Sequence, residues 1–414
     1  MDYVKVGQEE LLNTYAQLPI CFDKGEECYL YDTDGNKYLD LVGGIAVNAL
    51  GYKNEKLLKK LNDAASEGFF HVSNLYYNKY TVEAAKLINE VAGSDKVFFA
   101  NSGAEANEGA LKLARKYGSS KGKSKILSFE HSFHGRTYGA VTLTGQEKYH
   151  KGFYPMVPDI EYGIYNDLES VKQIVDDKFA AIFVEPIQGE GGIIPATKEF
   201  LEGLRKICDE KDMLLIYDCV QCGCGRTGYM FAWQYYGIKP DIMTLAKAVG
   251  GGLPLSALCA YSKASNVFSP GDHASTFGGN PISCALSTVV INELKSGLLD
   301  HVKDVGAYFK SKLNELVKLY PNICSEVRGF GLMLGLEVKI TPKTIIDSAR
   351  KKGVLMCSAG YDVVRFVPPL VITKGEVDET IKVLNSIFSQ LWYNPIKKKE
   401  KYYWRKNINL LSRL

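Results

Sequence analysis

The sequence predicts an α/β protein with a mostly parallel central sheet, and three observations support this fold class. Short apolar runs alternate with helical patterns from about residue 51 to about residue 295, as repeated βαβ units require. Two of these runs lead directly into Asp218 and Lys247, and such runs are typical of strands buried on both faces of a parallel sheet. The 414 residues also exceed one ordinary core, which predicts a second, smaller domain.

The first fifty residues are expected to form an extended arm and a β-hairpin. Residues 27–31 and 37–41 carry strand-forming side chains, and the Asp34-Gly35 pair between them is a turn signal. Residues 51–298 are expected to form the large domain. Its expected strands are residues 96–101, 125–129, 180–185, 213–218 and 241–246.

The pattern changes near residue 299, which predicts a smaller α+β domain over residues 299–391. The N-terminal hairpin is expected to join this domain in space. Residues 392–414 form a basic, aromatic tail, and a solvated extension is favoured over a segment that binds an acidic partner. The expected elements of the smaller domain are helices at 302–320 and 376–391 and extended segments at 329–338 and 362–367.

Composition and charge argue against several classes of function. The net charge is +3, and basic residues are scattered as far as the last twenty positions, so neither a nucleic-acid nor a membrane partner is expected. No apolar run approaches the ~18 residues that span a bilayer. Residues 1–10 include acids and resemble neither a secretory signal nor a transit peptide. The ten cysteines follow no repeating frame, which predicts reduced thiols in a cytoplasmic protein.

Two motifs within residues 219–228 suggest a metal site and a dinucleotide site, but the surrounding sequence supports neither. Cys219, Cys222 and Cys224 form a C-x-x-C-x-C cluster, but a structural zinc site usually needs four ligands and no second Cys/His pair has suitable spacing, so no metal is expected. Residues 223–228 match the dinucleotide fingerprint G-x-G-x-x-G. They do not follow a strand directly, and no acidic strand end stands ~20 positions further on. A glycine-rich turn is favoured, with a nicotinamide oxidoreductase as a rival class.

The segment at 101–107 follows an expected strand and opens a helix. Ser102 can cap that helix, and Gly103 allows its backbone to approach a ligand closely. The free N–H groups of a first helical turn bind anions. The alternative is an ordinary capped helix without a ligand.

Lys247 ends a buried strand and is followed by a glycine-rich turn. Burial of an ammonium is costly unless it is paired or its pKa falls, and a lysine with a lowered pKa suits Schiff-base chemistry. A surface lysine at a strand end is the alternative. Pyridoxal phosphate (PLP) requires a lysine for its aldehyde, an anion site for its phosphate and a carboxylate beside its ring nitrogen. Lys247, the 101–107 segment and Asp218 together supply these three requirements.

At this point the sequence resembles the class-III aminotransferases, which are PLP-dependent transferases of fold type I, and within them most closely the acetylornithine aminotransferases. The resemblance extends from about Thr14 to Leu391. The motifs that carry it are Gly43-Gly-Ile-Ala-Val-Asn-Ala-Leu-Gly51, Ser73-Asn-Leu-Tyr-Tyr-Asn78, Asn101-Ser-Gly-Ala-Glu-Ala106, Ser132-Phe-His-Gly-Arg-Thr137, Val184-Glu-Pro-Ile-Gln-Gly-Glu-Gly-Gly192, Leu245-Ala-Lys-Ala248 and Ser275-Thr-Phe-Gly-Gly-Asn-Pro281.

The resemblance implies a role in cofactor binding for nine residues. Lys247 would form the Schiff base and then move the proton, and Asp218 would pair with the ring nitrogen. The resemblance also implies a homodimer with shared active sites. The remaining implied contacts are Gln221 with the phenolic oxygen of the ring, Ser102, Gly103 and Ala104 with the phosphate, Phe133 and Val220 with the two ring faces, and Thr276 with the phosphate bound in the partner subunit.

The same resemblance implies transfer of the δ-amino group of N-acetylornithine to 2-oxoglutarate, a step of arginine biosynthesis. Glutamate places a carboxylate where acetylornithine places a CH₂, so a fixed arginine would be left unpaired with one of the two substrates. Glu190 is expected to pair with Arg365 and release it only for glutamate. Arg136 is expected to hold the far carboxylate of either substrate, and Ser275 to contact acetylornithine. A structural salt bridge is the alternative for each arginine.

Two departures from the family pattern and three rival functions accompany these expectations. Cys219 stands where the family usually has Glu, and residues 52–55 replace a His-x-His-Pro pattern. The nearest rival is a related ω-aminotransferase acting on ornithine, succinylornithine, succinyl-diaminopimelate or 4-aminobutyrate. Residues 43–48 lack the tyrosine of ornithine enzymes, which favours the acylated substrate. A catalytically silent binding protein is the third rival, beside the oxidoreductase.

Overall fold

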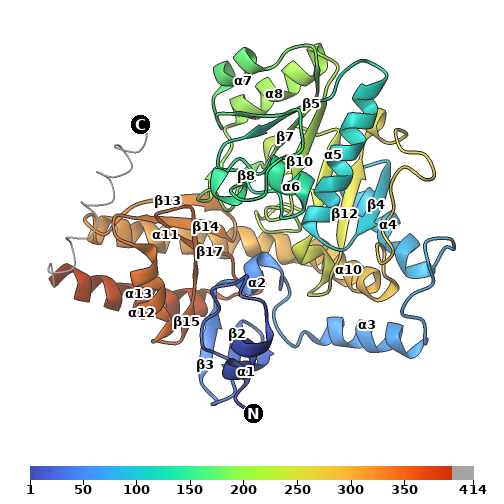
Figure 1. The fold of residues 1–414 in the computed structure, drawn as a ribbon. Coiled ribbons are helices and arrows are strands. Elements are labelled where there is room, and N and C mark those ends of the chain that lie inside the picture. Colours follow the sequence, from blue (N-terminus) through green and yellow to red (C-terminus); the bar gives the residue numbers. More distant parts are fainter. Residues whose placement is uncertain (394–414) are drawn as a thin grey trace.

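The computed structural model describes residues 1–393, and Figure 1 shows its fold. The largest sheet has seven strands. The strand order is β4-β12-β11-β10-β7-β5-β6. β12 runs antiparallel to both of its neighbours, and the other strands are mutually parallel. The predicted α/β class with a mostly parallel sheet is therefore confirmed. The strands are β4 (Lys96–Ala100), β5 (Lys125–Phe129), β6 (Ile160–Gly163), β7 (Phe179–Val184), β10 (Leu214–Asp218), β11 (Ile242–Leu245) and β12 (Ser256–Ala260).

Alternate residues of the central strands contact different helices, which explains why these strands are apolar throughout. On β10, Leu214 and Ile216 pack in the same cluster as α5 (Gly103–Ser119). Leu215 and Tyr217 pack in the cluster that includes α8 (Lys198–Glu210). A strand covered on both faces cannot alternate between apolar and polar residues.

The five predicted strands of this sheet are present, with ends within two residues of those expected. β6 and β12 are additional. β12 consists of Ser256-Ala-Leu-Cys-Ala260, and such small side chains give little strand signal. It is nevertheless buried at every position because it lies between β4 and β11.

A second sheet contains the C-terminal strands, in the order β13-β14-β17-β16. They are β13 (Cys324–Phe330), β14 (Met333–Val338), β16 (Cys357–Ala359) and β17 (Val363–Phe366), all antiparallel to their neighbours. α11 (Leu299–Leu319) and α12 (Pro342–Arg350) pack against these strands, and α13 (Lys374–Tyr393) packs against both helices. The extended segment predicted at 329–338 is in fact the end of β13, a turn at Gly331 and the whole of β14, because Gly331 adopts a φ of 59°.

The N-terminal hairpin is present and joins the C-terminal part of the chain, as predicted. β2 (Tyr29–Asp32) pairs with β3 (Lys37–Asp40), and β3 pairs with β15 (Val354–Leu355). β1 (Phe22–Glu26) completes this third sheet. The arm is not simply extended, because it contains α1 (Tyr3–Glu10), which Asp2 caps by accepting a hydrogen bond from the Lys5 N–H.

The remaining helices connect or flank these sheets. One helical run within residues 1–393, Pro281–Leu319, has the length and apolar composition of a membrane span, and half of the relevant stretch is buried inside the protein. This stretch is long because it consists of two helices, α10 and α11, which follow each other through an irregular turn at Gly297. α10 packs against α3 and α4. The helices that connect or flank the sheets are α2 (Gly43–Ala46), α3 (Glu55–Ser66), α4 (Lys79–Ala92), α6 (Tyr138–Leu143), α7 (Leu168–Ile174), α9 (Ala232–Tyr236) and α10 (Pro281–Glu293).

The glycine-rich run at 223–228 is a turn that connects the two main sheets. The buried guanidinium of Arg226 donates hydrogen bonds to the carbonyl oxygens of Leu332 and Pro368. Residues 219–222 separate this run from the end of β10, and α9 begins only at Ala232, with Phe231 as its N-cap. The glycines therefore do not join a strand directly to a helix, as a dinucleotide site requires. The prediction of a glycine-rich turn is confirmed.

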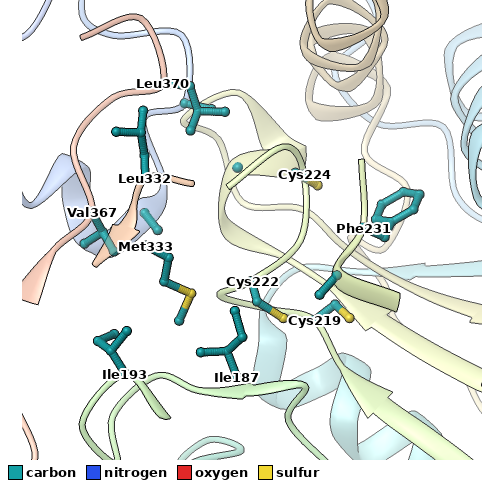
Figure 2. Close-up of a cluster of buried hydrophobic side chains, with 14 of the residues drawn as sticks. Ile187, Ile193, Cys219, Cys222, Cys224, Phe231, Leu332, Met333, Val367 and Leu370 are labelled. Atoms are coloured by element: carbon teal, nitrogen blue, oxygen red, sulfur yellow. The ribbon is translucent and has the colours of Figure 1, made fainter. Parts of the chain in front are cut away.

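The cysteine cluster lies within an apolar layer beside this turn (Figure 2). Cys219, Cys222 and Cys224 are each 1% exposed, and Figure 2 shows them in the same cluster as Leu332 and Met333. All ten cysteines are unpaired thiols. Within residues 1–393, no three His, Cys, Asp or Glu side chains come together as a metal ion would require. Of the tail predicted at 392–414, residues 392–393 extend α13, and the rest lies outside the described residues.

Candidate active site

Asp218 is buried at the carboxyl end of β10, where three groups fix its carboxylate. Oδ2 accepts a hydrogen bond from Asn107 Nδ2 at 2.8 Å and lies 2.7 Å from His134 Nδ1. Oδ1 accepts a hydrogen bond from the Val220 N–H at 2.9 Å. Asn107 comes from α5 and His134 from the loop after β5, so the carboxylate is held between separate elements.

Lys247 lies just beyond the neighbouring strand, β11. Asp218 is paired with Thr244 across the two parallel strands, so both candidate residues are at the same edge of the sheet, where open α/β sheets bind ligands. Lys247 has a φ of 54°, a conformation that is strained for a residue with a side chain and that is common at functional sites. Burial lowers the pKa of its ammonium group, and the Glu190 carboxylate offsets only part of that shift. A lowered pKa makes the amine a better nucleophile.

The segment between β4 and α5 offers free backbone donors. Ser102 caps α5 by accepting a hydrogen bond from the Glu105 N–H at 3.3 Å, and Glu105 Oε2 accepts hydrogen bonds from the Ser102 hydroxyl and the Asn101 N–H. Within residues 1–393, the N–H groups of Gly103 and Ala104 have no hydrogen-bond acceptor. Two such groups at a helix N-terminus suit a phosphate.

Val220 and Phe133 are positioned by contacts with this segment and with the strand ends. A Cβ on Gly103 would lie 2.8 Å from Val220 Cγ1, so only glycine allows this approach. The Phe133 N–H donates to Glu185 Oε1 at 2.9 Å, and Glu185 Oε2 accepts from the Gly189 N–H at 3.0 Å. Burial and the Asp218 charge raise the pKa of Glu185 to about 8. Through its two hydrogen bonds, Glu185 connects two loops that border the site.

Arg365 forms an ion pair with Glu190, as predicted from the sequence. Arg365 on β17 is 2% exposed, and its Nη1 donates to Glu190 Oε1 and, at 3.1 Å, to Gln221 Oε1. Gln221 Nε2 lies 3.4 Å from Glu190 Oε1, and Arg365 Nε donates to Cys357 Sγ at 3.3 Å. Burial acts to raise the pKa of Glu190, but the Arg365 charge outweighs this effect, so the pKa of Glu190 is lowered. Burial acts to lower the pKa of Arg365, but its contacts with Cys357 and Glu190 outweigh this effect, so the net shift of the pKa is upward.

Arg136 lies on the exposed side of the site. Its guanidinium carbon is 4.0 Å from the centroid of the Tyr149 ring and 5.5 Å from that of Phe133. Neither an ion pair nor a hydrogen bond engages the Arg136 side chain within residues 1–393. Its donors therefore remain available for an anion.

Ser275 contacts the segment at 101–107, whereas within residues 1–393 no hydrogen bond or ion pair joins the Thr276 side chain to another candidate residue. Ser275 Oγ accepts a hydrogen bond from Asn101 Nδ2 at 3.1 Å, and its carbonyl oxygen accepts one from Asn74 Nδ2 at 2.7 Å. Thr276 is exposed.

Four residues that contact the site were not singled out from the sequence. His134 lies within the quoted motif at 132–137, and Asn107 follows the motif at 101–106 directly, so both were close to recognised signals. Glu185 is the last residue of the strand predicted at 180–185, and the position of a carboxylate at a strand end was a usable signal. Tyr149 has no such signal, because its neighbours Phe133 and Arg136 are distant in sequence.

The fold and this arrangement define a PLP-dependent enzyme of fold type I. The chain belongs to the class-III aminotransferases, whose family model matches residues 12–388. It is similar to acetylornithine aminotransferases from Caldanaerobacter subterraneus subsp. tengcongensis (50% identity, 92% of this chain and 98% of the relative) and from Aquifex aeolicus (50% identity, 91% and 99%).

Solved structures show the same relationship. The ornithine aminotransferase of Toxoplasma gondii ME49 superposes with a TM-score of 0.90 at 31% identity, covering 94% of this chain and 95% of that one. The N-acetylornithine aminotransferase of Stenotrophomonas maltophilia K279a superposes with a TM-score of 0.80 at 32% identity, covering 94% and 99%. The expected family and cofactor are therefore confirmed.

Proposed function

We propose that this enzyme transfers the δ-amino group of N-acetylornithine to 2-oxoglutarate, giving N-acetylglutamate semialdehyde and glutamate. The observation that carries the proposal is the contrast between the two arginines. Arg365 is buried and paired with Glu190, whereas Arg136 is exposed and has no anionic partner within residues 1–393. Arg136 can therefore bind the carboxylate that both substrates carry, whereas Arg365 is closed by Glu190. This arrangement suits two substrates of which only glutamate carries a second carboxylate, next to the reacting amine.

The residues at the strand ends fit PLP in chemistry and placement. When bound, PLP supplies an aldehyde that accepts amino groups and a ring that stabilises negative charge on the substrate carbon. We assign Asp218 to the ring nitrogen, Gln221 to the phenolic oxygen, and Phe133 and Val220 to the ring faces. Support for Asp218 comes from the donors that hold its carboxylate.

The phosphate and the proton transfer require other groups. Ser102, Gly103 and Ala104 would bind the phosphate, since two of their N–H groups are free and lie at a helix N-terminus. Lys247 would bond the cofactor and afterwards carry the proton between the substrate carbon and the cofactor carbon, for which a lowered pKa is suited.

The substrate would lie between Arg136 and Arg365. Arg136 would bind the far carboxylate of either substrate through its planar fork of donors. With glutamate, Glu190 would withdraw and Arg365 would bind the α-carboxylate. With N-acetylornithine, the Glu190–Arg365 pair would stay closed, which avoids a buried unpaired charge. Ser275, fixed by Asn101, would contact the acetylornithine.

A second candidate is transfer from free ornithine, which the structural similarity to an ornithine aminotransferase favours. The discriminating segment at 43–48 borders the site. A Cβ on Gly43 would lie 3.0 Å from the Val367 carbonyl oxygen, two residues after Arg365, and one on Gly252 would lie 3.5 Å from Asn48 Oδ1. This segment has no tyrosine to engage a free α-amine, which favours the acylated donor.

We further propose a cytoplasmic homodimer, in which Thr276 reaches the phosphate in the partner subunit. The free thiols support a reducing compartment. The exposed position of Thr276, beside the 59% exposed Phe277, supports a contact made by another chain. We propose the domain division at 50/51 and 298/299, since separate sheets lie on either side of these positions.

Steady-state kinetics with purified PLP-loaded enzyme test the proposed substrate. N-acetylornithine, ornithine, succinylornithine and 4-aminobutyrate are compared as donors to 2-oxoglutarate, with Lys247→Ala as the inactive control. The highest kcat/KM is expected for N-acetylornithine. A higher kcat/KM for ornithine would establish the second candidate instead.

A further inference from the structure

Tyr149 contacts two residues of the site at once. It ends the short 3₁₀ helix at Glu147–Tyr149, and the guanidinium carbon of Arg136 lies 4.0 Å from the centroid of its ring. The edge of the same ring system meets Phe133, with centroids 5.7 Å apart and an interplanar angle of 77°. Both distances lie within the range of attractive contacts of aromatic rings with cations and with other rings. Tyr149 therefore links the proposed carboxylate-binding residue to a proposed cofactor-stacking residue.

The backbone around Tyr149 is anchored on both sides. Its N–H donates to the Gln146 carbonyl oxygen at 2.9 Å, and Gln146 Nε2 donates to the Ser132 carbonyl oxygen at 2.8 Å. On the other side, His150 Nε2 lies 2.8 Å from the Val141 carbonyl oxygen. These bonds fix the helical turn relative to the loop that carries Phe133. The backbone of Tyr149 is thus held in place beside that loop.

The contact uses the face of the ring and not the hydroxyl group. Within the part of the chain that the structure describes, the Tyr149 hydroxyl makes no hydrogen bond. Arg136 likewise has no ion pair there, so its contacts with Tyr149 and Phe133 are what orient it. An arginine in solution samples many rotamers, and ordering it on binding costs affinity. A ring that holds the guanidinium beforehand removes part of that cost.

We infer that Tyr149 is a positioning residue, which holds the guanidinium of Arg136 ready for the substrate carboxylate. The inference rests on the proposed function in one respect, namely the binding of that carboxylate by Arg136. Tyr149 itself touches neither the reacting carbon nor the proton in transit. Its loss should therefore affect substrate affinity far more than the chemical step.

Substrate truncation separates this role from a structural one. Tyr149→Leu, Tyr149→Phe and Arg136→Leu holoenzymes are assayed with N-acetylornithine and with the N-acetylated four-carbon diamine, which is the same donor without its carboxylate. Tyr149→Leu is expected to raise the KM for N-acetylornithine about threefold to tenfold, with kcat changed less than twofold and the KM of the diamine unaltered. Tyr149→Phe keeps the ring and should restore the wild-type KM. Tyr308→Leu, on α11, is the matched control.

Each contrary result identifies what is wrong. If Arg136→Leu raises the KM for N-acetylornithine and Tyr149→Leu does not, the positioning role is wrong and the proposed function stands. An equal rise in KM for the diamine would show general damage to the site and would also overturn the inference. An unchanged KM in Arg136→Leu would refute the carboxylate assignment and with it the inference. If Tyr149→Leu does not fold, Tyr149→Met provides the same comparison without a ring.

Discussion

The imidazole Nδ1 of His134 lies 2.7 Å from Oδ2 of Asp218, and both side chains are buried. Asn107 donates to the same oxygen at 2.8 Å, and its own Oδ1 accepts a hydrogen bond from the Thr244 hydroxyl at 2.7 Å. The edge of the His134 ring packs on Phe183, with centroids 4.7 Å apart. These contacts therefore hold the carboxylate of Asp218 in one orientation at the position proposed for the ring nitrogen of PLP.

Replacement of Asp218 by Asn should abolish most of the activity without removing the cofactor. The amide keeps the shape of the side chain but loses the charge, and it presents an NH₂ group where His134 or Asn107 now donates. The kcat is expected to fall at least ~100-fold, the magnitude typical of losing a preorganised electrostatic contact. The rate of the glutamate half-reaction, followed by the absorbance of bound PLP, measures this effect. Asp209→Asn on the exposed side of α8 is the control, and a near-normal rate in Asp218→Asn would refute the assignment.

Glu190→Gln should change the choice between substrates. Gln retains the size of the side chain but leaves the buried Arg365 without its counter-charge, so the arginine is available to any carboxylate. We expect the ratio of kcat/KM for glutamate to that for N-acetylornithine to rise about tenfold, or ~1.4 kcal/mol. The two half-reactions, measured separately on the same preparation, give this ratio. Glu202→Gln, an exposed residue of α8, should leave the ratio unchanged, and the same result for Glu190→Gln would remove the switch from the mechanism.

The sequence predicts those parts of the structure that depend on local pattern. β10 and β11 were located to within one residue because unbroken apolar runs mark strands buried on both faces. The family resemblance supplied the Glu190–Arg365 pair. By contrast, the contacts of His134 and Asn107 with Asp218 join residues 84 and 111 positions apart, and no local pattern encodes such a meeting. The helix at Tyr3–Glu10 was missed because it buries no residue, so it lacks the apolar stripe by which helices are recognised.

Cys219→Ala should weaken the fold and leave catalysis intact. Successive residues of a strand point to opposite faces, so Asp218 faces Asn107 on α5, whereas Cys219 packs in the same cluster as Tyr217 and Phe231. Figure 2 shows Cys219 and Phe231. Burial raises the pKa of the Cys219 thiol, which keeps it neutral and apolar in character. Loss of the sulfur should cost about 1 kcal/mol, measured by urea unfolding, with kcat within twofold of wild type. Cys21→Ala, at a partly exposed thiol, is the control. A large fall in kcat would place Cys219 in the site after all.

Lys247→Met should remove a pH-dependent destabilisation of the cofactor-free protein. Burial lowers the pKa of Lys247 in the folded state, whereas the unfolded chain keeps the ordinary value of about 10.4. Below the folded pKa the ammonium is present in both states, and its burial costs the full penalty. Between the two pKa values the unfolded chain binds more protons than the folded one, so the wild-type free energy of unfolding rises with pH across this window.

The comparison of the two proteins isolates this contribution. Lys247→Met has no ammonium to bury, so its cofactor-free form should be more stable than wild type near pH 7, and the difference should shrink as the pH approaches about 10. Urea unfolding of both cofactor-free proteins across this range measures the difference. Lys206→Met, at an exposed lysine of α8, should show no such trend. A difference between Lys247→Met and wild type that stays constant with pH would mean that Lys247 keeps an ordinary pKa, and its readiness to react with an aldehyde would then need another physical cause.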